Sequence, residues 1–386
     1  MPIEIEFFEE DRKLVVGDPS SVSTLRKAYY GESEGAAVFL SPEDAMYMLD
    51  VRNGRCLDEF GREMRFNELA SHYSDVPRLM TRYYAFKDWR DRGLVIRPVS
   101  EAKTYSRNPT QKYPSPGFDV PKYGAVARFY PDDNMSVIDD SEIGERMYRE
   151  YWFGQYGTYK ADKHGKYSKL DIFETVFLAK HSSIKIENAT VEEIISYAKM
   201  NNSFFEPIYN VYEDWRLRGF IVKTGFKFGT HFRIYFPGAS PAREEDEWIH
   251  SKHVLHVFPR DMQLLTSELS RAIRVAHSVR KTFILAIPGE ELVSETQADF
   301  LLYHRKKGGI ETPDNGSPKY LMLALNEDEK ISGAYLAGAI ESAKRIGLNL
   351  LLAIVDRETS VTYYLVRRIE MKGSRYEYYE IDWKQP

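Results

Sequence analysis

The feature that most constrains the fold is an internal repeat. The segment "YYAFKDWRDRGLVIRP" (83–98) matches "YNVYEDWRLRGFIVKT" (209–224), and each shared residue recurs 126 positions later. The same spacing relates Gly31 to Gly157, each of which follows a tyrosine. A fixed internal period is typical of a structural unit that occurs more than once. The repeat therefore predicts that a helical, winged-helix-like first half is present twice.

A different repeat covers the remainder of the chain. The segment "FRIY" (232–235) pairs with "FLLY" (300–303), and "ILAI" (284–287) pairs with "LLAI" (351–354), at offsets of 68 and 67 residues. These short apolar segments are typical of strands. We expect a mixed-sheet second half that also occurs twice.

Together the repeats predict an α/β protein built from three α+β units. At 386 residues the chain is long enough for two or three domains. The proline-rich segment 106–121 separates the first repeat from the middle unit. The predicted units are a degenerate N-terminal unit (1–112), an intact middle unit (113–290) and a degenerate C-terminal unit (291–386).

Local patterns place several elements. Segment 41–50 begins with Ser-Pro-Glu, a capping serine followed by proline at the first helical position, and segment 190–200 begins with a capping threonine followed by acids. Both predict helices. Residues 263–279 carry apolar side chains near helical spacing, whereas 253–258 and 281–287 are rich in β-branched and aromatic residues. A helix that leads into a strand is expected there.

Composition excludes several classes of protein. The single cysteine, Cys56, excludes an internal disulfide and a cysteine-cluster metal site. The N-terminus "MPIEIEFFEEDRK" is acidic where a signal peptide is basic and apolar. No apolar run approaches the roughly 18 residues of a membrane span. We therefore expect a soluble cytoplasmic protein without a membrane partner.

Charge is unevenly distributed. The formal net charge is −5, although binding of nucleic acid depends on Lys and Arg. Acids concentrate in segment 244–247, while segment 271–281 has basic residues and no acid. This pattern allows a local basic site on an acidic molecule. The basic residues of the second segment are Arg271, Arg274, Arg280 and Lys281.

Three stretches resemble the catalytic half of archaeal tRNA-splicing endonucleases. They are "GFKFGTHFRIY" (225–235), "HSKHVLHVF" (250–258) and "RAIRVAHSVRKTFILAI" (271–287). The resemblance implies an RNA-cutting enzyme that uses a tyrosine, a histidine and a lysine in that order along the chain. In this chain these residues are Tyr235, His250 and Lys281.

The resemblance also implies the chemistry. Tyr235 takes the proton from the ribose 2′-OH, His250 protonates the departing 5′ oxygen, and Lys281 stabilises charge on the phosphate. The expected products carry 2′,3′-cyclic phosphate and 5′-hydroxyl ends, with no metal and no cofactor. A free tyrosine has a pKa of about 10, so Tyr235 needs a neighbouring positive charge, which we expect Lys281 to supply.

Further residues are predicted to contact RNA. In the resembling family an arginine at the position of Arg274 stacks on a base flipped out of the RNA. If the helix continues to Lys281, the two side chains lie about two turns apart on similar faces. A segment after Gly157 has four more residues than the first copy and gains lysines interleaved with tyrosines. A flexible solvated loop is the alternative interpretation. The lysines predicted to contact the RNA backbone are Lys160, Lys163 and Lys166.

The C-terminal unit is expected to have lost its chemistry. Along the second repeat, Tyr235 aligns with Tyr303, but the catalytic histidine aligns with Ser317 and the lysine with Leu348. Because the resembling enzymes assemble four units, a chain with one intact unit implies a homodimer. The predicted contact to the partner subunit is the acidic loop with Asp356 and Glu358; the alternative is an exposed hairpin turn.

Other interpretations remain open. A tyrosine at a strand end is usually an amphipathic residue at the edge of a core. His250, His253 and His256 have a spacing that suggests zinc, although on a strand His253 points away from the other two. We predict cleavage of precursor tRNA at intron boundaries in bulge-helix-bulge RNA. The alternatives are a catalytically silent RNA-binding or scaffolding subunit and a metal-dependent nuclease.

Overall fold

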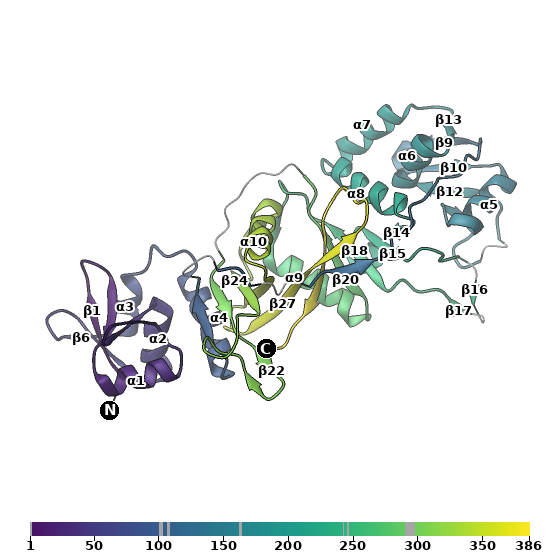
Figure 1. Ribbon diagram of the computed structural model, residues 1–386. Helices are drawn as coiled ribbons and strands as arrows, with labels where there is room; N and C mark the ends of the chain where they lie inside the picture. The colour runs from purple at the N-terminus through teal and green to yellow at the C-terminus, as the bar shows by residue number, and fades with distance from the viewer. Residues whose placement is uncertain are drawn as a thin grey trace.

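A long central sheet joins two smaller modules at its ends (Figure 1). Within the described ranges, no helix has both the length and the apolar character needed to cross a membrane. The computed structural model describes residues 2–99, 103–105, 109–161, 164–241, 243–244, 247–289 and 298–386.

The N-terminal module combines a mixed sheet of strand order β3-β4-β2-β1-β5-β6 with helices, of which α1 and α2 contact the sheet and α3 and α4 contact α2. In β1 glutamates alternate with apolar residues, so that one face of the strand is buried and the other is exposed. Its strands are β1 (Glu4–Phe8), β2 (Lys13–Val16), β3 (Glu32–Glu34), β4 (Ala37–Leu40), β5 (Arg55–Leu57) and β6 (Glu63–Met64). Its helices are α1 (Pro19–Lys27), α2 (Pro42–Val51), α3 (Phe66–Ser71) and α4 (Leu79–Asp91).

The second module has a sheet of order β11-β12-β10-β9-β13. The pairs β1–β5 and β9–β13 are both parallel, and the other pairs that the two orders share are antiparallel. The two modules therefore have the same strand order. The strands are β9 (Val126–Tyr130), β10 (Met135–Ile138), β11 (Gln155–Tyr156), β12 (Ser168–Asp171) and β13 (Lys185–Ile186). The helices are α5 (Ser141–Tyr151), α6 (Ile172–His181), α7 (Val191–Asn201) and α8 (Phe205–Leu217), with a 3-10 turn at η1 (Pro131–Asp133).

The local helix predictions are confirmed. Ser41 caps α2 with proline directly behind it, and Thr190 caps α7. The sequence predicted a helical, winged-helix-like first half and did not predict the sheets of the two modules. Many of their strands are only two to four residues long, too short for the alternation of apolar and polar residues to be recognised.

The central sheet has 11 strands within the described residues. Its main path is β14-β15-β18-β20-β28-β27-β26-β24-β21-β7, and β8 (Gln111–Tyr113) pairs with β27. One half contains β14 (Ile221–Thr224), β15 (Phe232–Tyr235), β18 (His253–Val257), β20 (Thr282–Ala286) and β28 (Tyr378–Trp383). The other half contains β7 (Ile96–Pro98), β21 (Phe300–Leu302), β24 (Tyr320–Asn326), β26 (Asn349–Val355) and β27 (Val361–Met371).

Both halves of this sheet have the same sequence of strand directions. From each outer edge inward the pairings are antiparallel, antiparallel, parallel and antiparallel, and the halves meet at the antiparallel pair β27–β28. The first segment of the chain supplies β7, whose neighbour β21 comes from the last segment. The division into three consecutive units stays a prediction, but strands from the first and the last unit pair directly.

Helices cover both faces of the central sheet. Helices α9 (Thr266–Ser278) and α10 (Gly333–Arg345) pack on one face, and α4 and α8 contact the strands from the other. The remaining elements are the turn η2 (Phe226–Phe228) and three short ribbons: β16 (Arg243–Glu244) with β17 (Glu247–Trp248), β19 (Gln263–Leu265) with β25 (Lys330–Ser332), and β22 (Arg305–Lys306) with β23 (Gly309–Ile310).

The repeated Asp-Trp-Arg triplet makes equivalent contacts in α4 and α8. Trp89 and Trp215 are fully buried beneath the central sheet. The preceding aspartates accept hydrogen bonds from Tyr363 on β27 and from Tyr378 on β28, at 2.7 and 2.8 Å. The following arginines donate to backbone carbonyls at the ends of α1 and α5. The triplet therefore ties each module to its half of the sheet.

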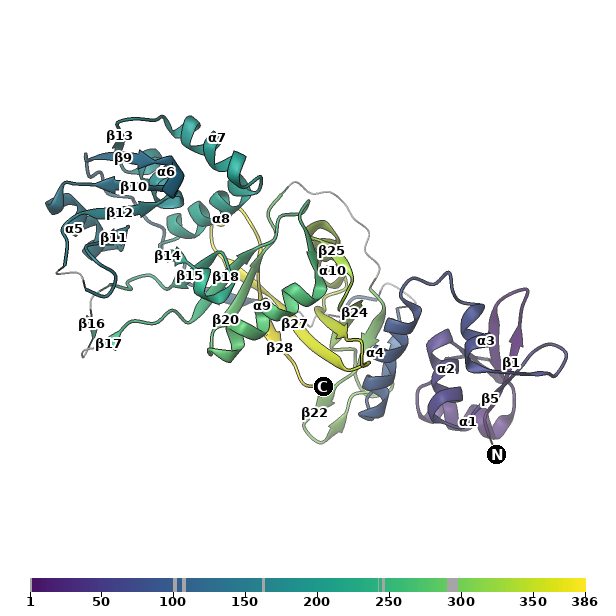
Figure 2. The same cartoon turned by 180° about the vertical axis from the view of Figure 1, so that it is seen from behind.

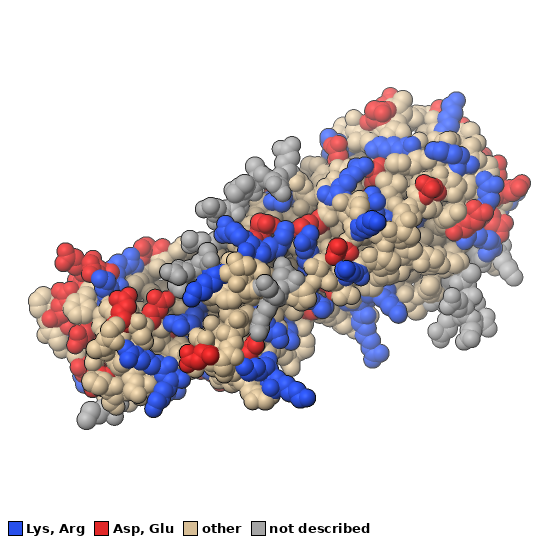
Figure 3. Space-filling view, in the orientation of Figure 1, with Lys and Arg blue, Asp and Glu red and all other residues tan. Residues whose placement is uncertain are grey.

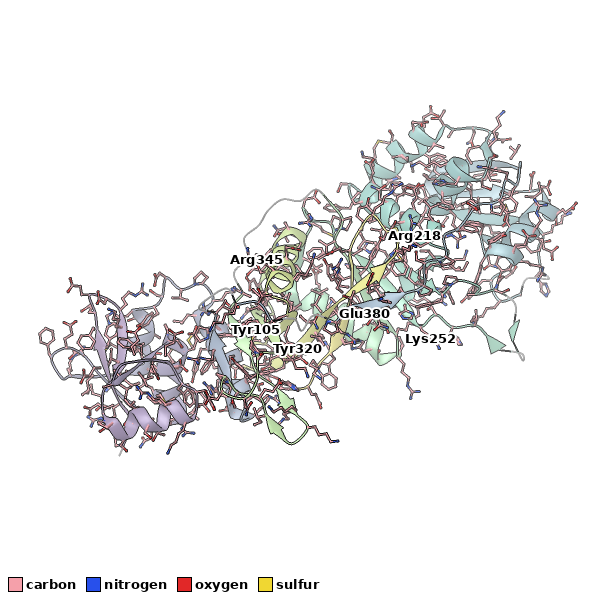
Figure 4. The ribbon with its side chains drawn as sticks, viewed as in Figure 1. Tyr105, Arg218, Lys252, Tyr320, Arg345 and Glu380 are labelled. Atoms are coloured by element: carbon pink, nitrogen blue, oxygen red, sulfur yellow. The ribbon has the colours of Figure 1, made fainter. Side chains whose placement is uncertain are left out.

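A buried carboxylate marks the middle of the central sheet. Glu380 of β28 lies near the centre of Figure 4 and accepts a 2.6 Å hydrogen bond from the Tyr113 hydroxyl. The Arg367 guanidinium is 3.2 Å from the same carboxylate. A buried charge is tolerated when it is paired and hydrogen-bonded, as it is here.

Candidate active site

A cavity of about 320 Å³ lies where the second module meets the central sheet. Figure 2 shows the second module next to the end of the central sheet that carries β14 and β15. The module contributes aromatic and charged side chains to the wall, and the sheet contributes the three predicted catalytic residues. The principal lining residues are Trp152, Tyr159, Lys160, Lys169, Asp171, Glu174, Lys223, Arg233, Tyr235, His250, Ser251 and Lys281.

Strand pairing explains why three residues far apart in the sequence share one cavity. Tyr235 ends β15, which runs antiparallel to β18. His250 precedes β18 by a short loop, and Lys281 directly precedes β20, which is parallel to β18. The end of one strand and the starts of two others therefore meet at the same edge of the sheet.

Ser251 holds Lys281 in place, and its role was not predicted from the sequence. The Lys281 ammonium donates to the backbone carbonyl of Ser251 and to its hydroxyl, the latter at 3.0 Å. The Ser251 hydroxyl also acts to lower the pKa of Tyr235. Ser251 is buried, whereas the neighbouring His250 is exposed and open to a ligand. In the sequence, the only indication of a role for Ser251 is its position directly after His250, the candidate acid.

Burial raises the pKa of the Tyr235 phenol, against the direction that a tyrosine base needs. Its ring lies 4.7 Å from that of Trp152. The cation that opposes this rise is Arg233, two residues earlier on β15, and not Lys281 as the sequence predicts. The pKa of Lys281 is lowered by burial and by the charge of Arg233.

A buried ion pair forms one side of the cavity. The Lys223 ammonium lies 2.6 Å from Glu174 Oε1 and donates to the Gly154 carbonyl at 2.8 Å. The same carboxylate accepts from the Gly154 N–H at 3.0 Å. Burial and the neighbouring Glu174 charge raise the pKa of Asp171 to about 7. These contacts fix the loop that carries Trp152 relative to β14.

A second cavity, of about 240 Å³, has the same polar contacts in the first module. There the Gly31 N–H donates to Asp44 Oδ2 at 3.3 Å, and Arg97 donates to the Gly31 carbonyl at 2.6 Å. Gly31 and Gly154 both have positive φ, +61° and +67°. The structure therefore matches Gly31 with Gly154, and the predicted pairing with Gly157 is wrong. The inserted lysine-rich segment begins after Gly154, three residues before the predicted start after Gly157.

The predicted arginines lie outside the cavity lining. Arg271 and Arg274 are exposed on α9, and Arg280 follows its end. The helix stops at Ser278, and Arg280 has a positive φ of +56°. Lys281 therefore belongs to the start of a strand, and the expectation that it shares a helix face with Arg274 is wrong. The RNA-binding role of these arginines stays a prediction.

The lysine-rich segment folds over the cavity. Lys160 lines it, with its ammonium 5.8 Å from the Tyr159 ring centroid. Lys169 also lines it and donates to the Gly157 carbonyl at 2.7 Å. Lys166 is exposed, and Lys163 lies outside the described residues.

The predicted dimer loop is an exposed turn between β26 and β27. Asp356 Oδ1 accepts from the backbone N–H groups of Glu358 and Ser360, at 2.9 and 2.8 Å, and so organises the turn. Glu358 is exposed. These contacts fit a partner-binding loop and a solvated hairpin equally, so the dimer contact stays a prediction.

Charges are mixed on the face shown in Figure 3, where Lys and Arg alternate with Asp and Glu instead of forming one basic stripe. The histidines do not form a metal site. His256 pairs with His231 instead, with ring centroids 4.7 Å apart. Among the described residues, no group of three or more His, Cys, Asp or Glu is arranged to hold a metal ion.

Comparisons with known proteins agree with this site. Residues 205–295 match the family model described as "tRNA intron endonuclease, catalytic C-terminal domain", a range that contains all three predicted catalytic residues. The tRNA-splicing endonuclease of Methanopyrus kandleri is 37% identical over 176 residues, 44% of this chain and 91% of that protein. The enzyme of Pyrococcus furiosus is 33% identical over 168 residues, 40% of this chain and 91% of that protein.

A longer alignment relates most of the chain to an enzyme of the same name. The tRNA-splicing endonuclease of Methanococcoides burtonii is 25% identical over 323 residues, 67% of this chain and 89% of that protein. The mixed α/β fold, the matched catalytic domain and the near-complete coverage of these relatives agree with one another. The chain therefore belongs to the tRNA-splicing endonuclease family.

Proposed function

We propose that this protein cleaves precursor tRNA at intron boundaries within bulge-helix-bulge RNA, without a metal, and leaves 2′,3′-cyclic phosphate and 5′-hydroxyl ends. The observation that carries the proposal is the meeting of Tyr235, His250 and Lys281 around one cavity. A base, an acid and a cation are the groups that this transphosphorylation requires.

The three residues have distinct roles in the proposed reaction. The Tyr235 oxygen takes the proton of the 2′-OH, and the 2′ oxygen forms a bond to phosphorus. The bond from phosphorus to the 5′ oxygen breaks, and His250, which is exposed, gives its proton to that oxygen. Lys281 stabilises the charge that develops on the phosphate, held in place by Ser251.

Recognition of the substrate is proposed to rest on shape. The deep major groove of A-form RNA hides its base edges from side chains, so a bulged helix is read through its backbone and its unstacked bases. Lys160 lines the cavity and Lys166 is exposed nearby, positions suited to backbone phosphates. Arg274 is proposed to stack on a bulged base, and Arg271 and Arg280 to add phosphate contacts.

The proposed assembly is a homodimer that places two intact sites on one substrate. In each subunit the position of the catalytic lysine, directly before β20, corresponds to Leu348 in the C-terminal half, and that of the histidine corresponds to Ser317. The exposed turn with Asp356 and Glu358 is the proposed contact to the partner subunit. Equilibrium sedimentation of the wild type and of the Asp356→Ala/Glu358→Ala variant tests this assignment.

The test of the function uses one substitution for each role. Purified wild type, Tyr235→Phe, His250→Ala and Lys281→Ala are incubated with intron-containing precursor tRNA. Tyr235→Phe and His250→Ala are expected to cleave about 10²- to 10⁴-fold more slowly than the wild type, the usual size of a general acid–base contribution. Lys281→Ala is expected to cleave about 10²- to 10³-fold more slowly, as on loss of one stabilising donor. The matched control is Tyr303→Phe, because Tyr303 ends the corresponding segment in the other half of the sheet and should leave the rate unchanged.

The outcome also distinguishes the alternative. A wild-type protein that binds precursor tRNA but does not cut it would support the silent RNA-binding or scaffolding subunit. Cleavage by the wild type that continues at the same rate in all three variants would place the chemistry elsewhere.

A further inference from the structure

Arg233 occupies a position in the cavity that the predicted catalytic set does not explain. It lies two residues before Tyr235 on β15, and side chains two apart on a strand point to the same face. Both residues line the cavity. The guanidinium carbon is 5.9 Å from the centre of the Tyr235 ring.

Only part of the Arg233 guanidinium is used within the protein. Its Nε donates to the Thr224 carbonyl at 2.9 Å, which fixes the direction of the side chain. Among the residues whose side chains the structure describes, it forms no ion pair with a carboxylate. Among the carboxylates that line the cavity, Glu174 is already paired with Lys223. An anchored guanidinium with its outer N–H groups toward a cavity is suited to bind a phosphate.

The other half of the sheet shows that the fold does not need this arginine. Arg233 pairs with Lys223 of β14, and Leu301 pairs with Arg97 of β7. Lys223 and Arg97 both donate to the carbonyl of an equivalent glycine, so Leu301 is the structural counterpart of Arg233. Leu301 is buried in the apolar core.

The other half of the central sheet lacks the counterpart of Arg233 together with those of the histidine and the lysine. The counterpart strand keeps its phenylalanine and its terminal Tyr303, which pack in the core, but it has leucine in place of the arginine. The same half has also lost the counterparts of the histidine and the lysine. Arg233 is therefore absent where the chemistry is absent, and the tyrosine alone is retained for packing.

We propose that Arg233 is a further catalytic residue, which donates to a non-bridging oxygen of the phosphate at the bond to be cut. This inference rests on the proposed function. Arg233 and Lys281 then share the charge that develops when the 2′ oxygen attacks and the 5′ oxygen leaves, while the two proton transfers stay with Tyr235 and His250. Positioned cations at a phosphate contribute directly to the rate.

The same charge acts on the base. Arg233 is the charged group that opposes the rise in the pKa of Tyr235, together with the Ser251 hydroxyl, whereas the nearby Tyr159 adds to it. The other charged groups that face the cavity are Lys160, Lys169, Asp171, Glu174, Lys223 and Lys281. Removal of Arg233 therefore moves the pKa of Tyr235 upward and the rate profile toward higher pH. A purely structural role of the arginine produces no such displacement.

The experiment compares Arg233→Leu and Arg233→Lys with the wild type under single-turnover conditions. Leucine is the residue found at the counterpart position, so the strand accommodates it. The rate constant of Arg233→Leu is expected to fall about 10²- to 10³-fold, as on loss of one stabilising donor, and Arg233→Lys to recover part of it. Affinity for precursor tRNA with a 2′-deoxy nucleotide at the cleavage site should change less than about tenfold. The control is Arg128→Gln, an exposed arginine of β9 paired with Glu187.

The outcomes separate this inference from the proposed function. A wild type that does not cleave defeats the proposed function itself. A cleaving wild type with an Arg233→Leu variant of equal rate and unchanged pH profile overturns the role of Arg233 alone. Equal losses of rate and affinity would reduce Arg233 to a binding contact and also overturn it. If Arg233→Leu unfolds, the rate and pH profile of Arg233→Lys decide between the same outcomes.

Discussion

Replacement of Lys223 by methionine should destabilise the protein and loosen the wall of the cavity. Lys223→Met keeps the apolar stem and removes the ammonium that lies 2.6 Å from Glu174 and 2.8 Å from the Gly154 carbonyl. The Glu174 side chain is 4% exposed, and that of Lys223 is 11% exposed. The substitution therefore leaves a buried carboxylate without its cation.

The magnitude follows from this burial. Removal of one partner of a buried ion pair costs about 3–5 kcal/mol, because the remaining charge is uncompensated. The slight exposure of Lys223 and the Gly154 N–H that still donates to Glu174 favour the lower limit. We expect a loss of about 3 kcal/mol in the free energy of unfolding.

Urea denaturation followed by circular dichroism measures this loss. The double variant Glu174→Gln/Lys223→Met should be less destabilised than the sum of the two single variants, because neither charge is then left alone. The matched control is Lys199→Met, whose exposed pair with Glu206 should contribute less than about 1 kcal/mol. A Lys223→Met variant as stable as this control, or strictly additive losses in the cycle, would refute the reasoning.

Three further predictions concern pH, the triad and RNA affinity. Burial lowers the pKa of His231 to about 4 and of His256 to about 3, so the unfolded chain binds protons first. The free energy of unfolding should have its full value above pH about 6.5, and it should fall by up to about 1.4 kcal/mol per pH unit per histidine as the pH drops toward 4. A urea midpoint that is equal at pH 7 and pH 5 would contradict this. Ser251→Ala removes the hydroxyl that accepts a hydrogen bond from Lys281 and should slow cleavage about tenfold, measured in single turnover; an unchanged rate would show that Ser251 does not position Lys281. Lys160→Ala should weaken binding of precursor tRNA and lower the slope of log affinity against log salt by about 0.7–0.9, measured by filter binding; an identical slope would place Lys160 in solvent.

Local signals in the sequence predicted several elements correctly. The caps of α2 and α7 depend on residues within one turn of the helix, so Ser41 and Thr190 could be recognised without tertiary information. The strands β18 and β20 follow from their β-branched and aromatic content. The repeated sequence segments also located the two halves of the central sheet.

Contacts between distant residues could not be predicted in the same way. The pair Glu174–Lys223 joins positions 49 residues apart, and nothing in either segment indicates the other. The end of α9 was missed because no glycine or proline marks it; the chain turns at Arg280, which has positive φ. The charge that acts on Tyr235 was assigned to Lys281, although the strand expected over 232–235 already placed Arg233 on the same face as Tyr235.

The central claim is a metal-independent transphosphorylation at this cavity, and the fragment ends test it most directly. Purified protein and its His250→Ala variant are incubated with intron-containing precursor tRNA in EDTA, and both ends of each fragment are identified. The proposed mechanism predicts 2′,3′-cyclic phosphate and 5′-hydroxyl ends from the wild type alone. Fragments with 3′-hydroxyl and 5′-phosphate ends, or cleavage that EDTA abolishes, would contradict it.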